Sequence, residues 1–404
     1  MVKLTLQDLP LAGKKILIRV DYNVPLSKDG SITDDTRIRA SIPTIQKALQ
    51  DGAAVILISH LGRPKSKQDI QFSLGICAKR LSQLIAAPVL FATDCIGKEV
   101  DKMIQEIKGG QVLLLENLRY YPAEENPALD PNFAKELAKG IDYYVNDAFA
   151  AAHRAHSSTA IIEQYFPGRA AMGLLMEKEI HFLQPLLEDP KRPFYVVIGG
   201  AKVSSKIGGL KSLLQHVDAF FIGGGMGLTF LKAQGLEMGA STIETALLNE
   251  ARVFMQAAHE KKIPLYLPLD LVIADQFRND ATYKTLTLPE PIPAGWIGMD
   301  IGPITIQAWS ECFKKASTVF WNGPLGVCEF PHFARGTEAI ARCLVNLDAT
   351  TIIGGGDSVA AIQALGLAGK CTHLSTGGGA SLEFLEKGHL PGIDALSDKS
   401  QKNT

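Results

Sequence analysis

The stretch PFYVVIGGAKVSSKIGGLKSLL, from Pro193 to Leu214, decides the fold. A run of β-branched and aromatic residues ends at Gly199 and Gly200, and a segment of helical character follows. This order predicts a strand, a tight turn and a helix. Glycines let backbone N–H groups approach a ligand, and a helix N-terminus favours an anion. We therefore expect a phosphate-binding turn, with Lys202 and Lys206 projecting from one face of the helix.

The glycine-rich turns allow three other readings. The first is a glycine-ended core strand that leads into a surface helix with two solvated lysines. A Walker A loop is excluded, because no Gly-Lys pair in the chain is followed by Ser or Thr. A nicotinamide dehydrogenase is disfavoured, because no glycine cluster satisfies the GxGxxG fingerprint: Gly225 and Gly227 are followed by Phe230.

Length and composition narrow the class of protein. A chain of 404 residues is too long for one ordinary core, so we expect two domains. A formal net charge of -1 argues against a partner that is a nucleic acid or a membrane surface. The six cysteines form no CxxC pair, which suits a reducing cytoplasm. A two-domain solute-binding protein would normally carry an export signal, and MVKLTLQDLP does not resemble one.

Four apolar runs in the first half each end in charged or polar residues. The runs are KKILIRVDYNVP (14–25), AAVILISHLGRPK (53–65), QVLLLENLRYYP (111–122) and IDYYVNDAFAAAHRAHSS (141–158). Strands that alternate with helices predict a parallel sheet, whose ligands bind beyond the carboxyl ends of the strands. The side chains expected to converge there are Arg37, Arg63, Arg119, Arg154, His60, His153 and His156. Arginine forks bind carboxylate and phosphate oxygens, so the expected ligand is small and multiply anionic, although any single arginine could instead form a surface ion pair.

The strands of the second half end in glycine instead. YVVIGGAK, AFFIGGGMG, TIIGGGDS and HLSTGGGAS each close an apolar run with two or three glycines, and VFWNGPLGV closes another with Asn322, Gly323 and Pro324. Such ends admit a base, a ribose and phosphates against the main chain. Asp357, which follows Gly354 to Gly356, is placed to hold a metal ion near phosphates.

The two halves predict an α/β protein with two mainly parallel sheets flanked by helices. A connecting helix, MEKEIHFLQPLLEDP (176–190), is expected to be kinked at Pro185. The apolar segment LPGIDAL near the C-terminus is expected to dock on the first domain. We therefore predict one domain of residues 1–172 with 389–404, and a second of residues 173–388 that includes the hinge helix.

Seven motifs in order resemble the phosphoglycerate kinase family over essentially the whole chain. They are RVDYNVP, SHLGRP, LLENLR, NDAFAAAHRAHSS, GGAKVSSK, WNGPLGVCE and GGGDS. The resemblance implies two Rossmann-like domains that close about a hinge, and reversible phosphoryl transfer between ATP and the carboxylate of 3-phosphoglycerate, with Mg²⁺. We also expect a cytoplasmic enzyme of glycolysis that is a monomer and binds no nucleic acid or membrane. A carboxylate needs no general base, whereas a hydroxyl acceptor would; the residues alone do not choose between the two.

The resemblance also implies which residues bind each substrate. Phosphoglycerate would be held by Asp21, Asn23, Arg37, His60, Leu61, Gly62, Arg63, Arg119 and Arg154. The nucleotide would be held by Gly199, Gly200, Lys202, Lys206, Gly223, Gly224, Asn322, Pro324, Glu329, Gly354, Gly355, Gly356, Asp357 and Ser358. Within these sets Arg37 and Lys202 would be catalytic, Glu329 would meet the ribose and Asp357 the magnesium. Many relatives carry an acidic residue where this chain has Ser205, and their connecting helix is expected to lack Pro185.

Overall fold

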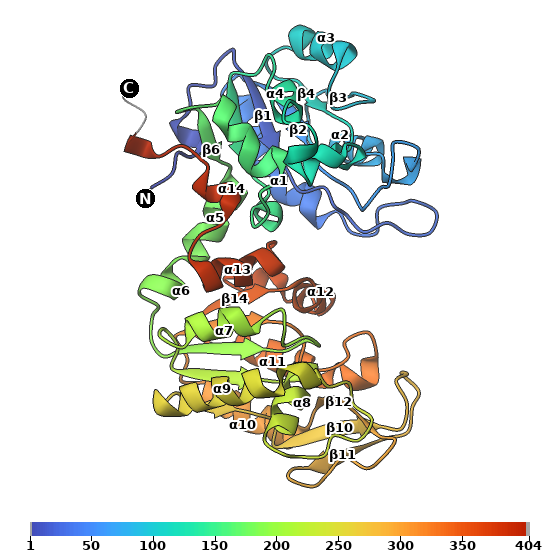
Figure 1. The fold of residues 1–404 in the computed structure, drawn as a ribbon, viewed down its shortest axis with the longest axis vertical. Coiled ribbons are helices and arrows are strands. Elements are labelled where there is room, and N and C mark those ends of the chain that lie inside the picture. Colours follow the sequence, from blue (N-terminus) through green and yellow to red (C-terminus); the bar gives the residue numbers. More distant parts are fainter. Residues whose placement is uncertain (1, 401–404) are drawn as a thin grey trace. The chain divides into compact units, whose positions relative to one another are not determined.

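The computed structural model describes residues 2–400, which form two compact units (Figure 1). Unit 1 consists of the chain up to His181 and the returning segment from His389, and unit 2 is Phe182–Gly388. The last four residues of the predicted returning segment lie outside the described residues. None of the helices within residues 2–400 has the length and apolar character needed to cross a bilayer.

Unit 1 is built on a six-stranded sheet in which every neighbouring pair of strands is parallel. In spatial order the strands are β3 (Val89–Phe91), β4 (Val112–Leu114), β2 (Ala54–Ile58), β1 (Lys15–Arg19), β5 (Tyr143–Asn146) and β6 (Ala170–Met172). The predicted parallel sheet is confirmed. β3 and β6 were not predicted, because three-residue strands at the sheet edges show little periodicity.

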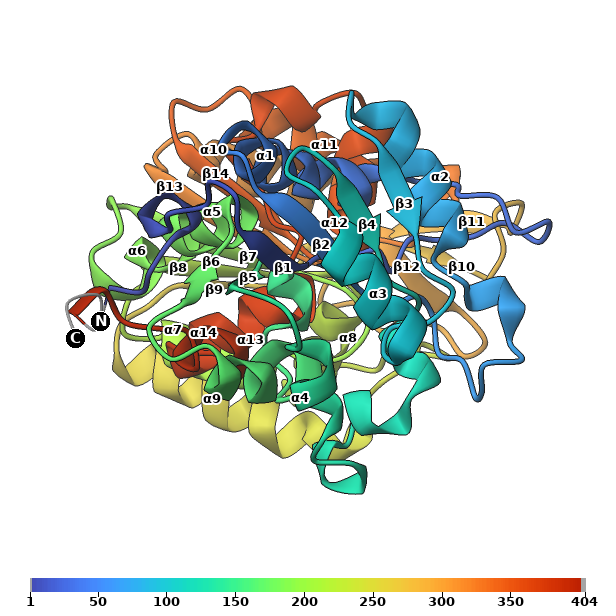
Figure 2. The same cartoon turned by 90° about the horizontal axis from the view of Figure 1, so that it is seen from above.

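Helices cover both faces of this sheet. They are α1 (Thr36–Gln50), α2 (Gly75–Leu84), α3 (Lys98–Glu106), α4 (Phe133–Leu137) and the returning α14 (Pro391–Asp394). Viewed from above, α1 lies on one side of the sheet, and α4 and α14 lie on the other (Figure 2). α1 buries Ile38, Ile45 and Ala48, which share one face of the helix and join the core.

The described part of the C-terminal segment packs against unit 1. Gly392 N donates to Ala152 O at 2.8 Å, and Asn146 Nδ2 donates to Gly392 O at 3.1 Å. A Cβ atom at Gly392 would lie 3.0 Å from Ala152 Cα and from Thr159 O. Only a glycine therefore lets the returning chain approach this closely.

Unit 2 has a second parallel six-stranded sheet. Its strands in spatial order are β15 (His373–Leu374), β14 (Thr350–Gly354), β13 (Thr318–Asn322), β7 (Phe194–Ile198), β8 (Ala219–Ile222) and β9 (Leu265–Tyr266). Its helices are α7 (Ile207–Leu213), α8 (Gly224–Ala233), α9 (Leu248–Glu260), α10 (Pro303–Phe313), α11 (Arg335–Leu344), α12 (Gly356–Ala364) and α13 (Gly379–Lys387). Phe221, Trp309 and Trp321 are fully or almost fully buried in its core.

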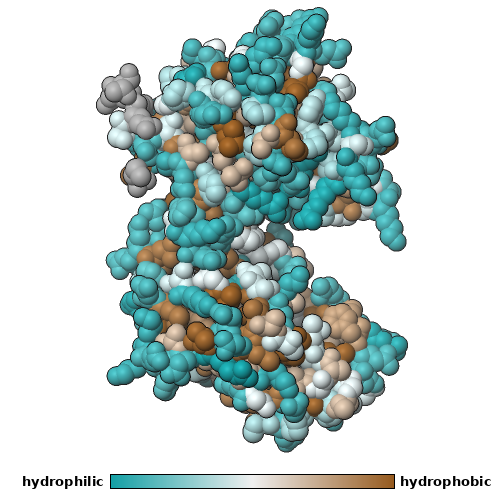
Figure 3. Space-filling model, in the orientation of Figure 1, coloured by the Kyte–Doolittle hydropathy of each residue, from teal (hydrophilic) through white to brown (hydrophobic). Residues whose placement is uncertain are grey.

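A three-stranded antiparallel sheet was not predicted. It consists of β11 (Tyr283–Thr287), β10 (Asp270–Ala274) and β12 (Ile297–Ile301). Leu271, Ile273 and Leu286 of this sheet pack with Leu228 and Leu231 of α8 in a small core. On the face seen in Figure 3, hydrophilic residues cover most of unit 1, and more hydrophobic residues reach the surface in unit 2.

The connecting helix is interrupted at the predicted proline. α5 (Leu174–Leu183) ends before Gln184, and α6 (Pro185–Glu188) begins with Pro185 at its first position. Proline lacks the N–H that a helix interior needs but is accepted in the first turn. The interruption is therefore a new helix start rather than a bend within one helix.

Candidate active site

Unit 1 gathers basic side chains at the loops that follow its strands. Arg37, in the first turn of α1, forms an ion pair with Asp21, which follows β1. Asn23 Oδ1 accepts a hydrogen bond from Gly62 N at 2.8 Å. Arg119 Nη1 donates to Gly62 O at 2.7 Å. Loops from β1, β2 and β4 are thus joined through their predicted site residues.

Two further arginines extend this basic cluster. Arg119 and Arg154 share the carboxylate of Glu125, at 2.8 and 3.9 Å. Arg63 is exposed, and no ion-pair partner for it is found among residues 2–400. Leu61 is buried, and Asn117 Nδ2 holds its carbonyl oxygen at 2.8 Å. Arg63 is therefore the predicted arginine that is most available to a ligand.

The buried His60 and the part-buried His156 both favour the neutral form. Burial, and then the charge of Arg19, lowers the pKa of His60 well below its ordinary value. Burial lowers the pKa of His156 to about 4, and Arg19 again adds to the effect. Neutral histidines surrounded by guanidinium groups indicate a strongly positive site, which an anion would stabilise.

Arg19 and Glu124 belong to this site, although neither was predicted as a ligand residue. Arg19 is 1% exposed, and its Nε donates to Ser158 Oγ at 2.9 Å. Glu124 is also 1% exposed and accepts from Ser158 Oγ at 2.6 Å. An arginine as the last residue of an apolar strand was the available signal, because a buried guanidinium requires a dedicated set of partners.

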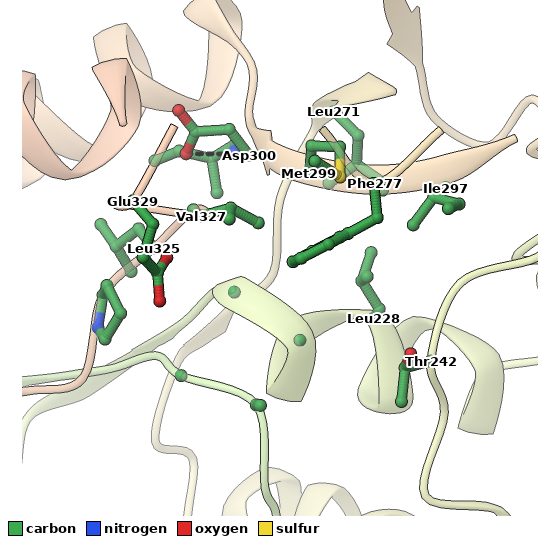
Figure 4. A pocket seen from close by; sticks show the side chains of 18 of the residues that line it. Leu228, Thr242, Leu271, Phe277, Ile297, Met299, Asp300, Leu325, Val327 and Glu329 are labelled. Carbon is green, nitrogen blue, oxygen red and sulfur yellow. Dashed lines mark hydrogen bonds between the residues drawn. The ribbon is translucent and has the colours of Figure 1, made fainter. Parts of the chain in front are cut away.

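Unit 2 holds a cavity of about 320 Å³ between its two sheets and α8 (Figure 4). Five predicted nucleotide residues line it: Gly200, Gly224, Pro324, Glu329 and Asp357. Its other lining residues, which were not among the predicted nucleotide residues, are Ala201, Gly225, Leu228, Thr242, Leu271, Phe277, Ile297, Gly298, Met299, Asp300, Ile301, Leu325, Gly326 and Val327. Seven of these fourteen residues come from the antiparallel sheet or from the loop after β10.

The cavity has an apolar end and an acidic end. The Phe277 ring projects into it between Leu228 and the side chains of Leu271 and Met299, and the Glu329 carboxylate enters from the opposite side (Figure 4). A flat aromatic base matches the apolar end, and hydroxyl groups match a carboxylate.

Asp300 in the cavity wall is a buried carboxyl group. Its oxygens accept from Ile301 N at 2.8 Å and Gly336 N at 2.7 Å. Burial raises the pKa of Asp300 to about 7. A Cβ atom at Gly326 would lie 2.2 Å from Asp300 Oδ1, so the glycine lets the loop after β13 pass against this carboxyl.

The predicted helical placement of Lys202 and Lys206 is wrong. α7 begins at Ile207, so both lysines precede the helix. The Glu244 carboxylate accepts from the backbone N–H groups of Val203 and Ser204, which holds residues 202–206 as a turn.

The two lysines have different surroundings. Lys202 is exposed, whereas Lys206 Nζ donates to Gly199 O at 2.9 Å and to Asn322 Oδ1 at 2.8 Å. Burial lowers the pKa of Lys206 to about 8. Asn322 is 3% exposed, and its Nδ2 has no hydrogen-bond partner within residues 2–400.

Some of the predicted glycines serve the protein rather than a ligand. A Cβ atom at Gly199 would lie 2.1 Å from Pro324 O, and one at Gly323 would lie 2.4 Å from Gly199 O. Gly200 N also donates to Pro324 O at 2.6 Å. The loops after β7 and β13 therefore cross in direct contact, and a side chain at either glycine would separate them.

The start of α12 is more open. Gly355 has a φ of 88°, and a Cβ atom at Gly356 would meet nothing within 4 Å. Asp357 follows on the exposed surface of the first turn, while Ser358 is buried and its Oγ accepts from Gly323 N at 2.8 Å. The exposed N–H groups of this turn are suited to phosphate oxygens.

Comparison with known proteins supports one family. The family model described as phosphoglycerate kinase matches residues 6–388. The phosphoglycerate kinase of Moorella thermoacetica is 51% identical over 99% of this chain and 100% of its own, and that of Dictyoglomus turgidum is 53% identical over 98% of each. The phosphoglycerate kinase structure from Coxiella burnetii is 38% identical, with a TM-score of 0.84, and covers 99% of this chain and 100% of its own. That from Pyrococcus horikoshii is 32% identical, with a TM-score of 0.85 and the same coverage.

Proposed function

The chain belongs to the phosphoglycerate kinase family, and we propose that its two domains divide the two substrates between them. The enzyme transfers a phosphoryl group reversibly between ATP and the carboxylate of 3-phosphoglycerate. In our proposal, residues 1–172 with 389–404 bind phosphoglycerate, and residues 173–388 bind the nucleotide. The observation that carries the proposal is the pairing of a cluster of arginines in unit 1 with a largely apolar cavity in unit 2.

The phosphoglycerate site is assigned to the basic cluster. The guanidinium groups of Arg63, Arg119 and Arg154 bind the phosphate, because paired N–H donors match phosphate oxygens. Asn23 and His60 add neutral donors, and Asp21 orients Arg37. Bound phosphoglycerate partly replaces Glu125 as the partner of Arg119 and Arg154, because the same two guanidinium groups bind the ligand phosphate and the Glu125 carboxylate.

The nucleotide site is assigned to the cavity and to the start of α12. The adenine lies at the apolar end beside Phe277, and Glu329 accepts from the ribose hydroxyls. The phosphates run past Asn322 and the buried Gly354 toward the N-terminus of α12, where Gly355 and the exposed Gly356 offer backbone N–H groups. Asn322 Nδ2, which lacks a partner in the described chain, supplies a donor for them.

Mg²⁺ is assigned to Asp357. No group of three or more His, Cys, Asp or Glu that suits a metal is found in the described part of the chain. A single exposed carboxylate nevertheless fits this ion, which usually takes one or two carboxylates together with substrate phosphates and water. When bound, the ion would neutralise charge on the ATP phosphates.

Catalysis is assigned to positioning and charge stabilisation. The attacking carboxylate is already ionised, so no side chain needs to remove a proton. Lys202 and Arg37 neutralise the charge of the phosphoryl group during transfer. Both are placed to move toward it, since Lys202 is exposed on a turn and Arg37 is part-exposed at the start of α1.

The setting of the enzyme is also part of the proposal. We infer a cytoplasmic monomer that has no nucleic-acid or membrane partner. All six cysteines are free, as expected in a reducing compartment.

The division of substrates is tested by steady-state kinetics with a coupled assay of ATP consumption. Arg154→Gln should raise the KM for 3-phosphoglycerate about tenfold or more and leave the KM for ATP within about twofold. Phe277→Ala should show the opposite pattern. An equal rise of both constants in either variant would contradict the assignment of one substrate to each domain.

A further inference from the structure

A hydrogen bond between Arg19 and His60 fixes the state of a proposed ligand residue. Arg19 Nη2 lies 3.0 Å from His60 Nδ1, and both side chains are buried. An arginine has only N–H donors and stays protonated, so His60 Nδ1 must accept. A histidine that accepts at Nδ1 and is neutral carries its proton on Nε2.

The guanidinium of Arg19 cannot easily turn away from this role. Its Nε donates to Ser158 Oγ, and its Nη1 donates to Val20 O. Ser158 is in turn fixed by Glu124, which accepts from its hydroxyl at 2.6 Å and from its N–H at 3.1 Å. Each nitrogen of the guanidinium thus has an acceptor. The Glu124 carboxylate is separated from the Arg19 guanidinium only by the Ser158 hydroxyl, which bonds to both.

His60 is also protected from protonation on every side. Besides Arg19, the charged and titratable groups that face it are Arg37, Arg119 and His156. All of these disfavour a second proton on the ring. His60 Nε2 has no hydrogen-bond partner in the described protein, which leaves this N–H for a ligand atom.

We propose that Arg19 is a positioning residue that holds His60 as the neutral Nε2–H tautomer, so that this nitrogen donates a hydrogen bond to an oxygen of phosphoglycerate. The inference rests on the placement of phosphoglycerate in unit 1. The ligand atom at Nε2 must be an acceptor, such as a carboxylate or phosphate oxygen. Arg19 itself does not contact the substrate; it acts through the ring that it orients.

Nitrogen NMR tests the tautomer in the unmodified enzyme. Long-range ¹H–¹⁵N correlations of protein labelled with ¹⁵N-histidine separate protonated from unprotonated ring nitrogens, and His60→Gln identifies the His60 signals. The expected result at pH 7 is a protonated Nε2 and an unprotonated Nδ1. A proton on Nδ1 would overturn the proposed role of Arg19 and leave the placement of phosphoglycerate untouched.

Titration of the same sample with 3-phosphoglycerate tests the contact. The Nε2 resonance of His60 should shift, while Nδ1 stays unprotonated. An Nε2–H ring that does not respond to saturating 3-phosphoglycerate would overturn the donation to substrate, and with it the place of His60 in the proposed site.

A double-mutant cycle tests whether Arg19 acts through His60. Arg19→Met is combined with Glu124→Gln, so that no buried charge is left unpaired, and this pair of changes is made with His60 present and with His60→Gln. With His60 present, the KM for 3-phosphoglycerate should rise about ten- to a hundred-fold, as for loss of a hydrogen bond to a charged group, with little change in the KM for ATP. In the His60→Gln background the same changes should have a much smaller effect, because the glutamine amide N–H can donate to the ligand regardless of the residue at position 19. Equal effects in both backgrounds would show that Arg19 acts through its charge or through folding instead.

Arg19→Lys is the matched conservative variant. It keeps a donor and a positive charge, so it should recover part of the affinity lost in the methionine variant, and the Nε2–H tautomer should persist. The proposal would be contradicted if Arg19→Lys kept the Nε2–H tautomer but bound 3-phosphoglycerate as weakly as the methionine variant does.

Discussion

Lys206 Nζ donates a 2.8 Å hydrogen bond to Asn322 Oδ1 and so joins the turn after β7 to the end of β13. The same ammonium group donates to two backbone oxygens, those of Gly199 at 2.9 Å and Asn322 at 3.1 Å. All three acceptors are neutral, so no carboxylate compensates the charge at hydrogen-bond distance. The pKa of Lys206 is accordingly lowered to about 8 by burial, and the charge of Asp357 acts in the other direction without reversing this effect.

The first prediction is that nucleotide binding takes up a proton through Lys206. Above pH 8 a fraction of Lys206 is neutral before binding, and nearby phosphates raise its pKa, so binding should weaken as the pH rises from 8 to 9.5. Calorimetry at pH 8.5 in buffers of different ionisation enthalpy should show proton uptake for the wild type and none for Lys206→Met. Lys211→Met, on the exposed face of α7, is the control that should retain the uptake. If proton uptake persisted in Lys206→Met, a group other than Lys206 would be the one that takes up the proton.

The second prediction concerns Arg37 and Lys202. Arg37→Ala and Lys202→Ala should each lower kcat about a hundred-fold or more, because charge that develops during transfer loses its partner. Arg39→Ala is the control for Arg37, because it removes an exposed ion pair from the same helix, α1, and should leave kcat nearly unchanged. A variant that keeps its kcat and changes only KM has no catalytic role.

Arg37→Ala has a structural side effect that the experiment must separate. It leaves Asp21, which is 8% exposed, without its cation. The double variant Arg37→Ala with Asp21→Asn removes the unpaired charge. If the loss of kcat persists in the double variant, it comes from the missing guanidinium rather than from a disturbed loop.

The third prediction is that Asp357→Asn weakens Mg-ATP binding and spares phosphoglycerate. Magnesium prefers an ionised carboxylate, and an amide supplies only a neutral oxygen. Titration calorimetry with each ligand alone should show about a tenfold or greater loss for Mg-ATP and little change for 3-phosphoglycerate. Asp348→Asn, at an exposed position of the same unit, is the control. Equal damage to both ligands would indicate a disturbed fold.

The fourth prediction concerns stability. Glu163 is 4% exposed, and neither carboxylate oxygen has a hydrogen-bond partner within residues 2–400. Burial raises the pKa of Glu163 well above its ordinary value. The folded state therefore binds a proton that the unfolded state releases above about pH 4.3, so the free energy of unfolding should fall as the pH rises above that value.

Replacement of Glu163 should relieve this cost. Glu163→Gln should raise Tm by a few degrees at pH 8 relative to the wild type, because the amide needs no proton uptake on folding, and the difference should shrink at pH 5. Glu106→Gln removes an exposed carboxylate and should change neither value. Thermal unfolding followed by circular dichroism at both pH values measures the effect, and a Tm difference independent of pH would contradict it.

The strands were the predictable part of the fold, and the antiparallel sheet was not. Runs such as Ile16–Ile18 and Val196–Ile198 are continuous apolar segments that end in charge or glycine, which is typical of buried parallel strands. β11 has four exposed residues out of five and β9 has only two residues, so neither carries a clear period. Leu271 lies in β10 of the antiparallel sheet, and Phe277 lies in the loop that follows it, so both residues at the apolar end of the cavity were missed together with this sheet.

Local pattern also misled where a distant side chain decided the structure. The spacing of Lys202 and Lys206 fits a helix, but the carboxylate of Glu244, forty residues later, holds the turn before α7. Likewise, a glycine at the end of a strand predicts that some group approaches its backbone closely, but it does not predict which group that is. Gly199 approaches Pro324, whereas Gly356 faces open space. Only the three-dimensional arrangement separates these cases.

The last prediction is that turnover requires closure of the two domains about the hinge. Each substrate is assigned to residues of a single unit, and the chain crosses between the units twice, near His181 and after Gly388. Gly388 ends α13 in the left-handed region with a φ of 74°, which glycine adopts without strain. In-line transfer needs reacting atoms within about 3 to 3.5 Å and a site without water, which would otherwise hydrolyse ATP.

Small-angle scattering measures this closure. The radius of gyration should be smaller with both substrates bound than with either alone, and an unchanged radius in the ternary complex would count strongly against the mechanism. Removal of the residues from Leu390 onward should lower kcat more than it weakens the binding of either substrate, because one of the two connections is lost. Gly392→Val provides the matched point variant, since a side chain there would press against Ala152 and Thr159 and loosen the docked segment without shortening it. If Gly392→Val weakened substrate binding as much as it lowered kcat, the segment would serve the binding site itself rather than the closing motion.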